Sequence, residues 1–193
     1  ANTNTADGTY QLRGLPPGTY YLRTHNNGSN YEEFKWWTDN SIGSYDCSVA
    51  QPIEIINTTI TGKNFQLGIG GSISGRVTAS DGTTGLSGLC INAWSEPCHL
   101  GYATGASTDG SGNYTIAGIP LDVGQLFIEV ESNSPECGAT MYVLEWYDGN
   151  QGTSDCNAAQ GVPVGSTNIN FSLEMGGAVS GTVYQSDGIT PVS

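Results

Sequence analysis

The five cysteines are the residues of this 193-residue chain whose chemistry is easiest to assign. None of them stands in a Cys-x-x-Cys motif, so their spacing favours disulfides formed in an oxidising compartment over a zinc site. Cys90 lies near Cys98 in the sequence, and Cys137 and Cys156 bracket one loop. The simplest pairing is therefore Cys90–Cys98 with Cys137–Cys156. Cys47 is left unpaired, as a free thiol or with a partner outside the chain.

A second chemical candidate is the segment 109–113, DGSGN, whose three oxygen-bearing side chains alternate as at the start of a calcium loop. The glutamate that would complete such a loop is missing, and Pro120 stands in its region. We therefore expect Asp109, Ser111 and Asn113 to shape a tight hairpin turn, with calcium binding as the alternative. The sequence predicts no other metal site and no cofactor.

Aromatic side chains are the candidates for carbohydrate contact, because they combine a flat apolar face with a polar edge. Trp36 and Trp146 stand at equivalent places in the two halves of the chain, which favours a packing role for this pair. Trp37 and Tyr147 alternate to the opposite face of the same strands. This second pair is the better candidate for contact with a sugar.

Four asparagines begin Asn-x-Ser/Thr motifs, which accept glycans in secreted proteins: Asn27, Asn57, Asn113 and Asn170. Such short motifs also arise by chance in a chain rich in Asn, Ser and Thr. A glycoprotein is therefore a hypothesis that depends on a secreted location.

Residues suited to catalysis or to nucleic-acid binding are scarce. His25 and His99 lie outside any Ser-His-Asp or metal-binding spacing, so the sequence predicts that the protein is not an enzyme. Five basic residues against 18 acidic ones give a net charge of −13, which argues against a nucleic-acid partner. No apolar run approaches the roughly 20 residues of a spanning helix, so no membrane insertion is expected.

The elements that must position these residues follow an internal repeat. Residues 70–82, GGSISGRVTASDG, return without a gap as residues 176–188, GGAVSGTVYQSDG, at an offset of 176 − 70 = 106. In each copy apolar residues alternate with small or polar ones before an Asp-Gly turn, which is typical of a strand with one buried face. A fixed offset of this kind indicates an array of similar units.

Other segments match at a similar offset. Residues 9–13 and 19–23 flank a Pro-Pro-Gly turn and predict a hairpin, and residues 113–116 and 124–128 predict another. With about seven short strands per unit, the sequence predicts an all-β fold of sandwich units. The predicted division is the back part of a first unit, a complete unit, and the first strand of a following unit: 1–69, 70–175 and 176–193.

The runs GGSISGRV, GLSGLCINAW, STDGSGNYTIAGIP, YVLEWYDGN and INFSLEMGG resemble the carboxypeptidase regulatory-like repeats. These belong with transthyretin-like modules and the B-type repeats of bacterial surface adhesins. The resemblance implies tandem Greek-key sandwiches of seven strands, of the transthyretin-like or prealbumin-like kind. It also implies a secreted or surface-anchored protein in which the repeats form a stalk or an accessory module. It does not identify a ligand, because one such fold serves many roles.

Together these features predict a non-catalytic structural protein, extracellular or at the cell surface, that is a stalk or fibre subunit of disulfide-stapled repeats. The alternative is a carbohydrate-binding accessory module of a larger secreted enzyme, with carbohydrate as its partner. For the fibre, we expect residues 176–184 to pair with the 1–69 unit of the next copy, head to tail, as in donor-strand complementation. That copy is either a separate subunit or a continuation of one tandem chain.

Overall fold

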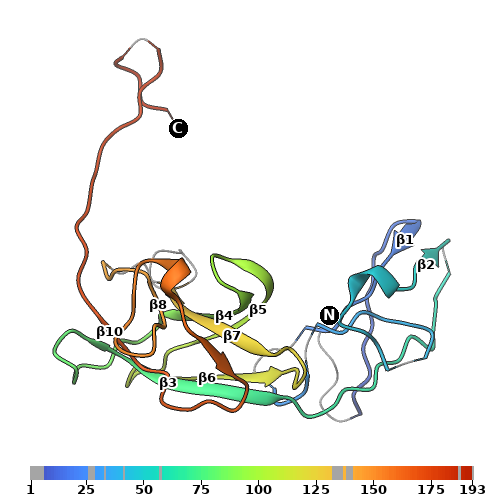
Figure 1. Cartoon of the computed structure of the whole chain (residues 1–193). Helices are drawn as coiled ribbons and strands as arrows, with labels where there is room; N and C mark the ends of the chain where they lie inside the picture. Colours follow the sequence, from blue (N-terminus) through green and yellow to red (C-terminus); the bar gives the residue numbers. More distant parts are fainter. Residues whose placement is uncertain are drawn as a thin grey trace. The chain divides into compact units, whose positions relative to one another are not determined.

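A computed structural model of the chain shows an all-β fold (Figure 1). The chain divides into two compact units. Residues 1–71 with 118–120 form the N-terminal unit, and residues 72–117 with 121–193 form the C-terminal unit. The structure describes residues 7–25, 29–32, 34–40, 42–56, 58–131, 137, 141–186 and 188–192. Within these ranges no helix has the length and hydrophobicity needed to cross a lipid bilayer.

The first sheet of the C-terminal unit is organised around β3 (Gly71–Ala79). It lies between β6 (Asn113–Ile119) and β10 (Phe171–Leu173), and β10 runs parallel to it. Because side chains alternate between the two faces of a strand, Ile73 and Val77 point the same way, and both are fully buried. The strand predicted at the start of the repeat is therefore confirmed and forms the middle of the sheet.

The second sheet of this unit has the strand order β5-β4-β7-β8, and β9 also pairs with β7. Its strands are β4 (Cys90–Glu96), β5 (Leu100–Ser107), β7 (Gln125–Glu131), β8 (Glu145–Trp146) and β9 (Gly161–Pro163). The central pair β4 and β7 is antiparallel, with Cys90 opposite Glu131 and Trp94 opposite Phe127. This register places the start of β4 beside the end of β7.

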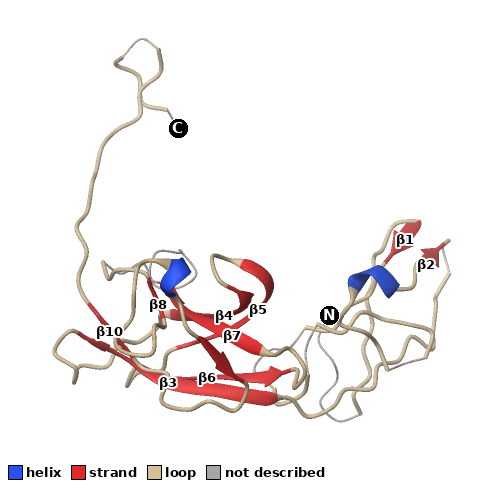
Figure 2. Ribbon diagram, in the orientation of Figure 1, coloured by secondary structure: helices blue, strands red, loops and turns tan. Residues whose placement is uncertain are grey.

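The two sheets bury their apolar faces against one core, as in a sandwich (Figure 2). The first sheet and its flanks contribute Ile73, Val77, Tyr114, Ile116, Ile169, Phe171 and Leu173, and the second contributes Ile91, Ala93, Leu126, Ile128, Val130, Trp146 and Val162. The ring of Tyr147 meets that of Phe171 at a centroid distance of 6.0 Å, which joins the two layers. Burial of these apolar side chains is the main force that holds the unit together.

The hairpin predicted for residues 113–116 and 124–128 is wrong, because β6 and β7 lie in different sheets. β6 belongs with β3, whereas β7 pairs with β4, β8 and β9. The connection between them carries the chain from one layer to the other. Gly118 and Gly124 have φ of 73° and 78° there, a region that favours glycine.

In the described part of the N-terminal unit, β1 (Gly18–Tyr20) and β2 (Ile53–Ile55) form a short sheet. The hairpin predicted for residues 9–13 and 19–23 is also wrong, since β1 pairs with β2 and residues 9–13 form no strand. A single turn of 3-10 helix, η1 (Cys47–Val49), precedes β2, as η2 (Cys156–Ala158) precedes β9.

Candidate functional site

The disulfides join other cysteines than the sequence predicted. Cys90 is bonded to Cys137 and Cys98 to Cys156, so the predicted pairs Cys90–Cys98 and Cys137–Cys156 are wrong. The four bonded cysteines are those expected, and Cys47 is free and exposed.

The length of β4 explains the error. Cys90 begins this seven-residue strand and Cys98 follows its end, so at about 3.3 Å per residue they are some 20 Å apart or more. A disulfide needs Cα atoms within about 7 Å. Each cysteine instead bonds across to a neighbouring segment, at Cα–Cα distances of 5.1 and 5.2 Å. Nearness in sequence was misleading because an extended strand separates the two thiols.

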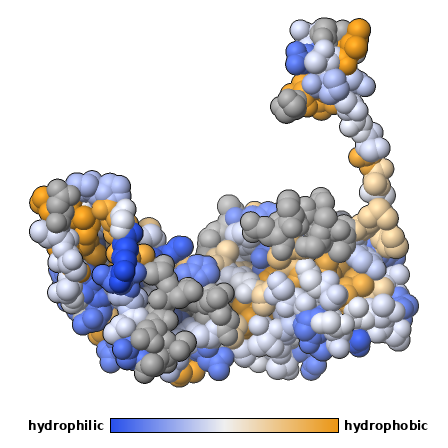
Figure 3. Space-filling model, turned by 180° about the vertical axis from the view of Figure 1, so that it is seen from behind, coloured by the Kyte–Doolittle hydropathy of each residue, from blue (hydrophilic) through white to orange (hydrophobic). Residues whose placement is uncertain are grey.

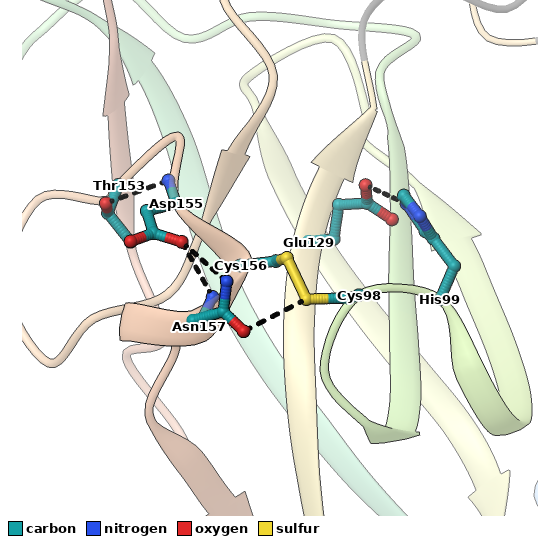
Figure 4. The surroundings of a disulfide bond; sticks show 7 residues. All are labelled: Cys98, His99, Glu129, Thr153, Asp155, Cys156 and Asn157. Carbon is teal, nitrogen blue, oxygen red and sulfur yellow. Dashed lines mark hydrogen bonds and ion pairs between the residues drawn. A yellow bond between two sulfur atoms is a disulfide. The ribbon is translucent and has the colours of Figure 1, made fainter.

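The Cys98–Cys156 bond stands in a polar cluster at one end of the second sheet (Figure 4). Asp155 caps η2 and accepts hydrogen bonds from the backbone N–H of Asn157 at 3.0 Å and from its side-chain amide at 3.1 Å. The first of these bonds satisfies a backbone N–H group that the first turn of a helix leaves free. Both bonds fix the turn that presents Cys156 to Cys98.

The neighbouring His99 lies beside a buried carboxylate. Its Nε2 is 2.6 Å from Oε1 of Glu129, and Nε1–H of Trp94 donates to Oε2 of Glu129 at 3.0 Å. The Glu129 side chain is 1 % exposed, while that of His99 is 54 % exposed. The imidazole also lies against the rings of Trp94 and Trp146, at centroid distances of 5.1 and 5.2 Å. Both carboxylate oxygens are therefore satisfied, as burial requires.

Backbone geometry adds to the constraint on this turn. Cys98 and His99 have φ of 61° and 66°, in the left-handed region that costs non-glycine residues about 1–2 kcal/mol each. The disulfide and the contact between His99 and Glu129 hold them there. An imidazole beside a buried carboxylate is part of a general-base arrangement, which would also need a nucleophile. Here the adjacent sulfur, that of Cys98, is bonded to Cys156. The disulfide and the contact of His99 with Glu129 hold the β4–β5 turn against the sheet.

Sequence reasoning missed this cluster, because only the register of the sheet brings Trp94, His99 and Glu129 together. One signal was available. Glu129 interrupts the apolar run of β7, where Ile128 and Val130 are fully buried. A charged residue inside such a run needs a buried partner.

The calcium candidate forms a turn in the structure. Asp109 Oδ1 accepts hydrogen bonds from the backbone N–H of Asn113 at 2.9 Å and of Ser111 at 2.8 Å, and these bonds lower the pKa of Asp109. The turn joins β5 to β6, which lie in different sheets, so it is not the predicted hairpin turn. Among the described residues, no group of three or more His, Cys, Asp and Glu side chains is placed to hold a metal ion.

The two sugar candidates take part in packing. Trp37 is only 5 % exposed, and Nζ of Lys63 lies 3.7 Å from the centroid of its ring. The prediction that Trp37 presents its ring to a sugar is therefore wrong, because Lys63 covers it. Tyr147 is half-buried against Phe171.

Two glycosylation candidates, Asn27 and Asn57, fall outside the described residues. Asn113 and Asn170 are exposed, which glycosylation requires. The Asn170 side chain also accepts a hydrogen bond from the backbone N–H of Arg76 at 2.9 Å. Glycosylation at these positions stays a prediction.

The carboxyl of Glu145, on β8, is sensitive to pH. Burial, together with the nearby negative charges of Asp148 and Glu174, raises its pKa to about 7. Its Oε2 is buried and has no hydrogen-bond partner among the described residues. Between about pH 4.5 and pH 7 the folded chain therefore holds a proton that the unfolded chain releases. Stability from this group is present at low pH and is lost as pH rises through 7.

We expect Glu145→Gln to raise the free energy of unfolding at pH 8 by about 1 kcal/mol, a value reduced for the partial solvent exposure of the side chain. At pH 5 the substitution should change little, because the carboxyl is then neutral. Urea unfolding of both proteins at the two pH values measures this. The exposed Glu96→Gln is the control. An equal effect of Glu145→Gln at pH 5 and pH 8 would contradict the assignment.

Backbone hydrogen bonds in the two units correspond pair by pair. Trp36 and Ser44 exchange N–H···O bonds of 2.7 and 3.0 Å, and Trp146 and Thr153 exchange bonds of 2.7 and 2.9 Å. Four more bonds of the N-terminal unit have a match: Trp37 N–H to Leu22 O, Gln51 N–H to Trp37 O, Glu32 N–H to Gly68 O, and the Tyr10 hydroxyl to Lys63 O. In the same order, their matches in the C-terminal unit are Tyr147 N–H to Ile128 O, Gln160 N–H to Tyr147 O, Val143 N–H to Glu174 O, and the Tyr114 hydroxyl to Ile169 O. These pairs assign a counterpart to many residues of the N-terminal unit.

Counterparts differ in burial on one surface. Leu12 is 42 % exposed, whereas its counterpart Ile116 is fully buried. Phe65 is half-buried, whereas Phe171 is 2 % exposed. In the C-terminal unit the corresponding strands β6 and β10 flank β3, while residues 9–15 and 63–67 form no strand. We call this surface the acceptor face; it comprises Tyr10, Leu12, Lys63, Phe65 and Leu67.

The segment after β10 shows the complementary feature. We call residues 177–185 the donor strand, because they repeat the sequence positions of β3 at the offset of 106. Val179 is 103 % exposed and Val183 is 73 % exposed, whereas their counterparts Ile73 and Val77 are fully buried. Apolar groups of this segment are visible at the surface (Figure 3).

No protein-family model, curated protein or solved structure matches the chain. The all-β fold and the two disulfides are features of the structure itself. Membership of the carboxypeptidase regulatory-like family remains a prediction from the sequence.

Proposed function

We propose that the chain is a non-catalytic structural module of an extracellular stalk or fibre, whose copies join head to tail by strand donation. The matched hydrogen bonds of the two units support a tandem array of related sandwiches, of the transthyretin-like Greek-key kind. The two disulfides support an extracellular or cell-surface location, since such bonds persist in oxidising compartments.

The exposure of Val179 and Val183 is the observation that carries the proposal. Their counterparts Ile73 and Val77 are 0 % exposed in the middle of a sheet. An extended segment with two exposed valines gains free energy by burying them, about 1.5–3 kcal/mol for each fully buried side chain. In strand donation, the receiving segments gain the backbone hydrogen bonds of the donated strand.

Donation between copies generates a filament. The donor strand and the acceptor face are different surfaces of the chain, so a contact between them is heterologous. Each copy that donates its strand still has an acceptor face for the next. Repeated contacts of this kind add copies to an open filament, unless the rotation between neighbouring copies closes them into a ring.

We expect the full chain to form a ladder of oligomers that lengthens with protein concentration, because association is governed by mass action. A chain that lacks residues 177–193 should remain a monomer. Light scattering coupled to size-exclusion chromatography measures the masses, and negative-stain electron microscopy shows whether the larger species are linear. If the chain of residues 1–193 stays monomeric at every concentration, the proposal is overturned.

A further inference from the structure

We infer that the donor strand binds the acceptor face in the register of β3, with Gly181 seated against the backbone carbonyl of Lys63. This inference rests on the proposed head-to-tail function and names its contact. The partner is a second copy of this sequence, on a separate chain or further along the same polypeptide. Gly181 would then be the residue that determines specificity.

The reason lies in how β3 is seated in the C-terminal unit. A Cβ atom added to Gly75 would stand 1.9 Å from the carbonyl oxygen of Ile169 and 3.0 Å from the ring of Tyr114. The hydroxyl of Tyr114 donates to that same carbonyl at 2.6 Å and is itself buried. Only glycine fits where the strand crosses this pair, since any side chain would overlap backbone atoms.

The acceptor face carries the same pair of groups. The hydroxyl of Tyr10 donates a hydrogen bond to the carbonyl oxygen of Lys63, as Tyr114 does to Ile169. The counterpart of Gly75 in the donor strand is Gly181, at the offset of 106. The tyrosine and the carbonyl are therefore already arranged for a strand with glycine at this position.

A second contact, made by the residue that follows the glycine, also determines the register. In the C-terminal unit, Oδ1 of Asn170 accepts a hydrogen bond from the backbone N–H of Arg76 at 2.9 Å. The counterparts are Asn64, which is exposed beside the acceptor face, and Thr182 of the donor strand. Because this bond uses the backbone of the donor, it tolerates the change from arginine to threonine. A shift by one residue would turn Val179 and Val183 to the wrong face.

The hydrogen bonds of the turn after the donor strand match those found after β3. Ala79 N–H donates to Thr84 O at 2.8 Å, and Gln185 N–H donates to Thr190 O at 2.7 Å. The bond from Gly82 N–H to Ala79 O likewise matches the bond from Gly188 N–H to Gln185 O. The bond from Leu86 N–H to Val77 O matches the bond from Val192 N–H to Val183 O. A segment that is preorganised in this way loses less conformational entropy on binding.

A peptide competition with the full chain tests the register. A synthetic peptide of residues 176–192 should occupy the acceptor face and shorten the oligomers. The same peptide with Gly181→Val should compete more weakly by roughly tenfold or more, because the added side chain overlaps the Lys63 carbonyl. The peptide with Ala178→Val is the matched control, since its counterpart Ser72 is exposed on β3. Neither substitution touches the folded units of the chain under test.

Hydrogen exchange identifies where the peptide binds. Backbone amides of residues 9–13 and 63–67 should become protected with the unmodified peptide and not with the Gly181→Val peptide. If the chain forms oligomers but both peptides compete equally, the register is overturned while head-to-tail assembly stands. If the chain is a monomer whose 9–13 and 63–67 amides are protected, and Gly181→Val in the chain removes that protection, the register stands. In that case the assembly proposal fails, because each tail fills its own acceptor face.

Discussion

Replacing Cys98 and Cys156 with serine is expected to lower the free energy of unfolding of the C-terminal unit by about 4 kcal/mol. The bond spans a sequence separation of 58 residues, and a cross-link of that length restricts the unfolded chain strongly. It also anchors the turn that brings His99 to Glu129, so its loss releases a contact that satisfies a buried carboxylate. Urea unfolding followed by tryptophan fluorescence measures the loss. Cys47→Ser should change nothing, because that thiol is exposed and free.

A double-mutant cycle distinguishes the observed pairing from a local one. Removing Cys156 from a chain that already lacks Cys98 should cost little more, because the bond is already gone. Removing Cys90 from the same chain should cost about as much again, because it breaks the second bond. The opposite pattern, in which Cys90 and Cys98 behave as one unit, would restore the local pairing.

Much of the C-terminal unit could be predicted from residue patterns. Ile73 and Val77 stand four apart among small and polar residues, and they form the buried face of β3. The alternation of Tyr114 and Ile116 likewise became β6. Local periodicity suffices for such strands, because their burial depends on one face only.

The sequence did not predict which strands pair. β6 and β7 are adjacent in the chain and were expected as a hairpin, but the connection between them crosses from one sheet to the other. The disulfide pairing and the contact of His99 with Glu129 depend on that topology. The buried ring of Trp37 is covered by Lys63, which is remote in sequence. Each of these errors concerns a long-range contact that spacing along the chain does not encode.

The second large effect is expected at Gly75. Gly75→Val should lower the free energy of unfolding of the C-terminal unit by about 3 kcal/mol or more, the upper part of the range for overpacked sites. The added Cβ would stand 1.9 Å from the carbonyl oxygen of Ile169 and 2.5 Å from its carbonyl carbon. These are backbone atoms, so β3 must shift out of the middle of its sheet to relieve the overlap. Urea unfolding and amide exchange along β6 and β10 report that shift.

Gly181→Val in the full chain is the matched comparison, because it makes the same substitution at the repeated position. An added Cβ at Gly181 meets no atom within 4 Å, so the free energy of unfolding should be unchanged. Oligomer formation should nevertheless be lost. The same substitution would thus disrupt packing within the unit at Gly75 and the contact between copies at Gly181. The reason is that β3 and the donor strand would pack against the same arrangement of a tyrosine hydroxyl and a backbone carbonyl. If Gly75→Val causes no loss of stability, the packing of β3 against the Ile169 carbonyl does not require glycine. The steric argument for glycine at position 181 would then be contradicted as well.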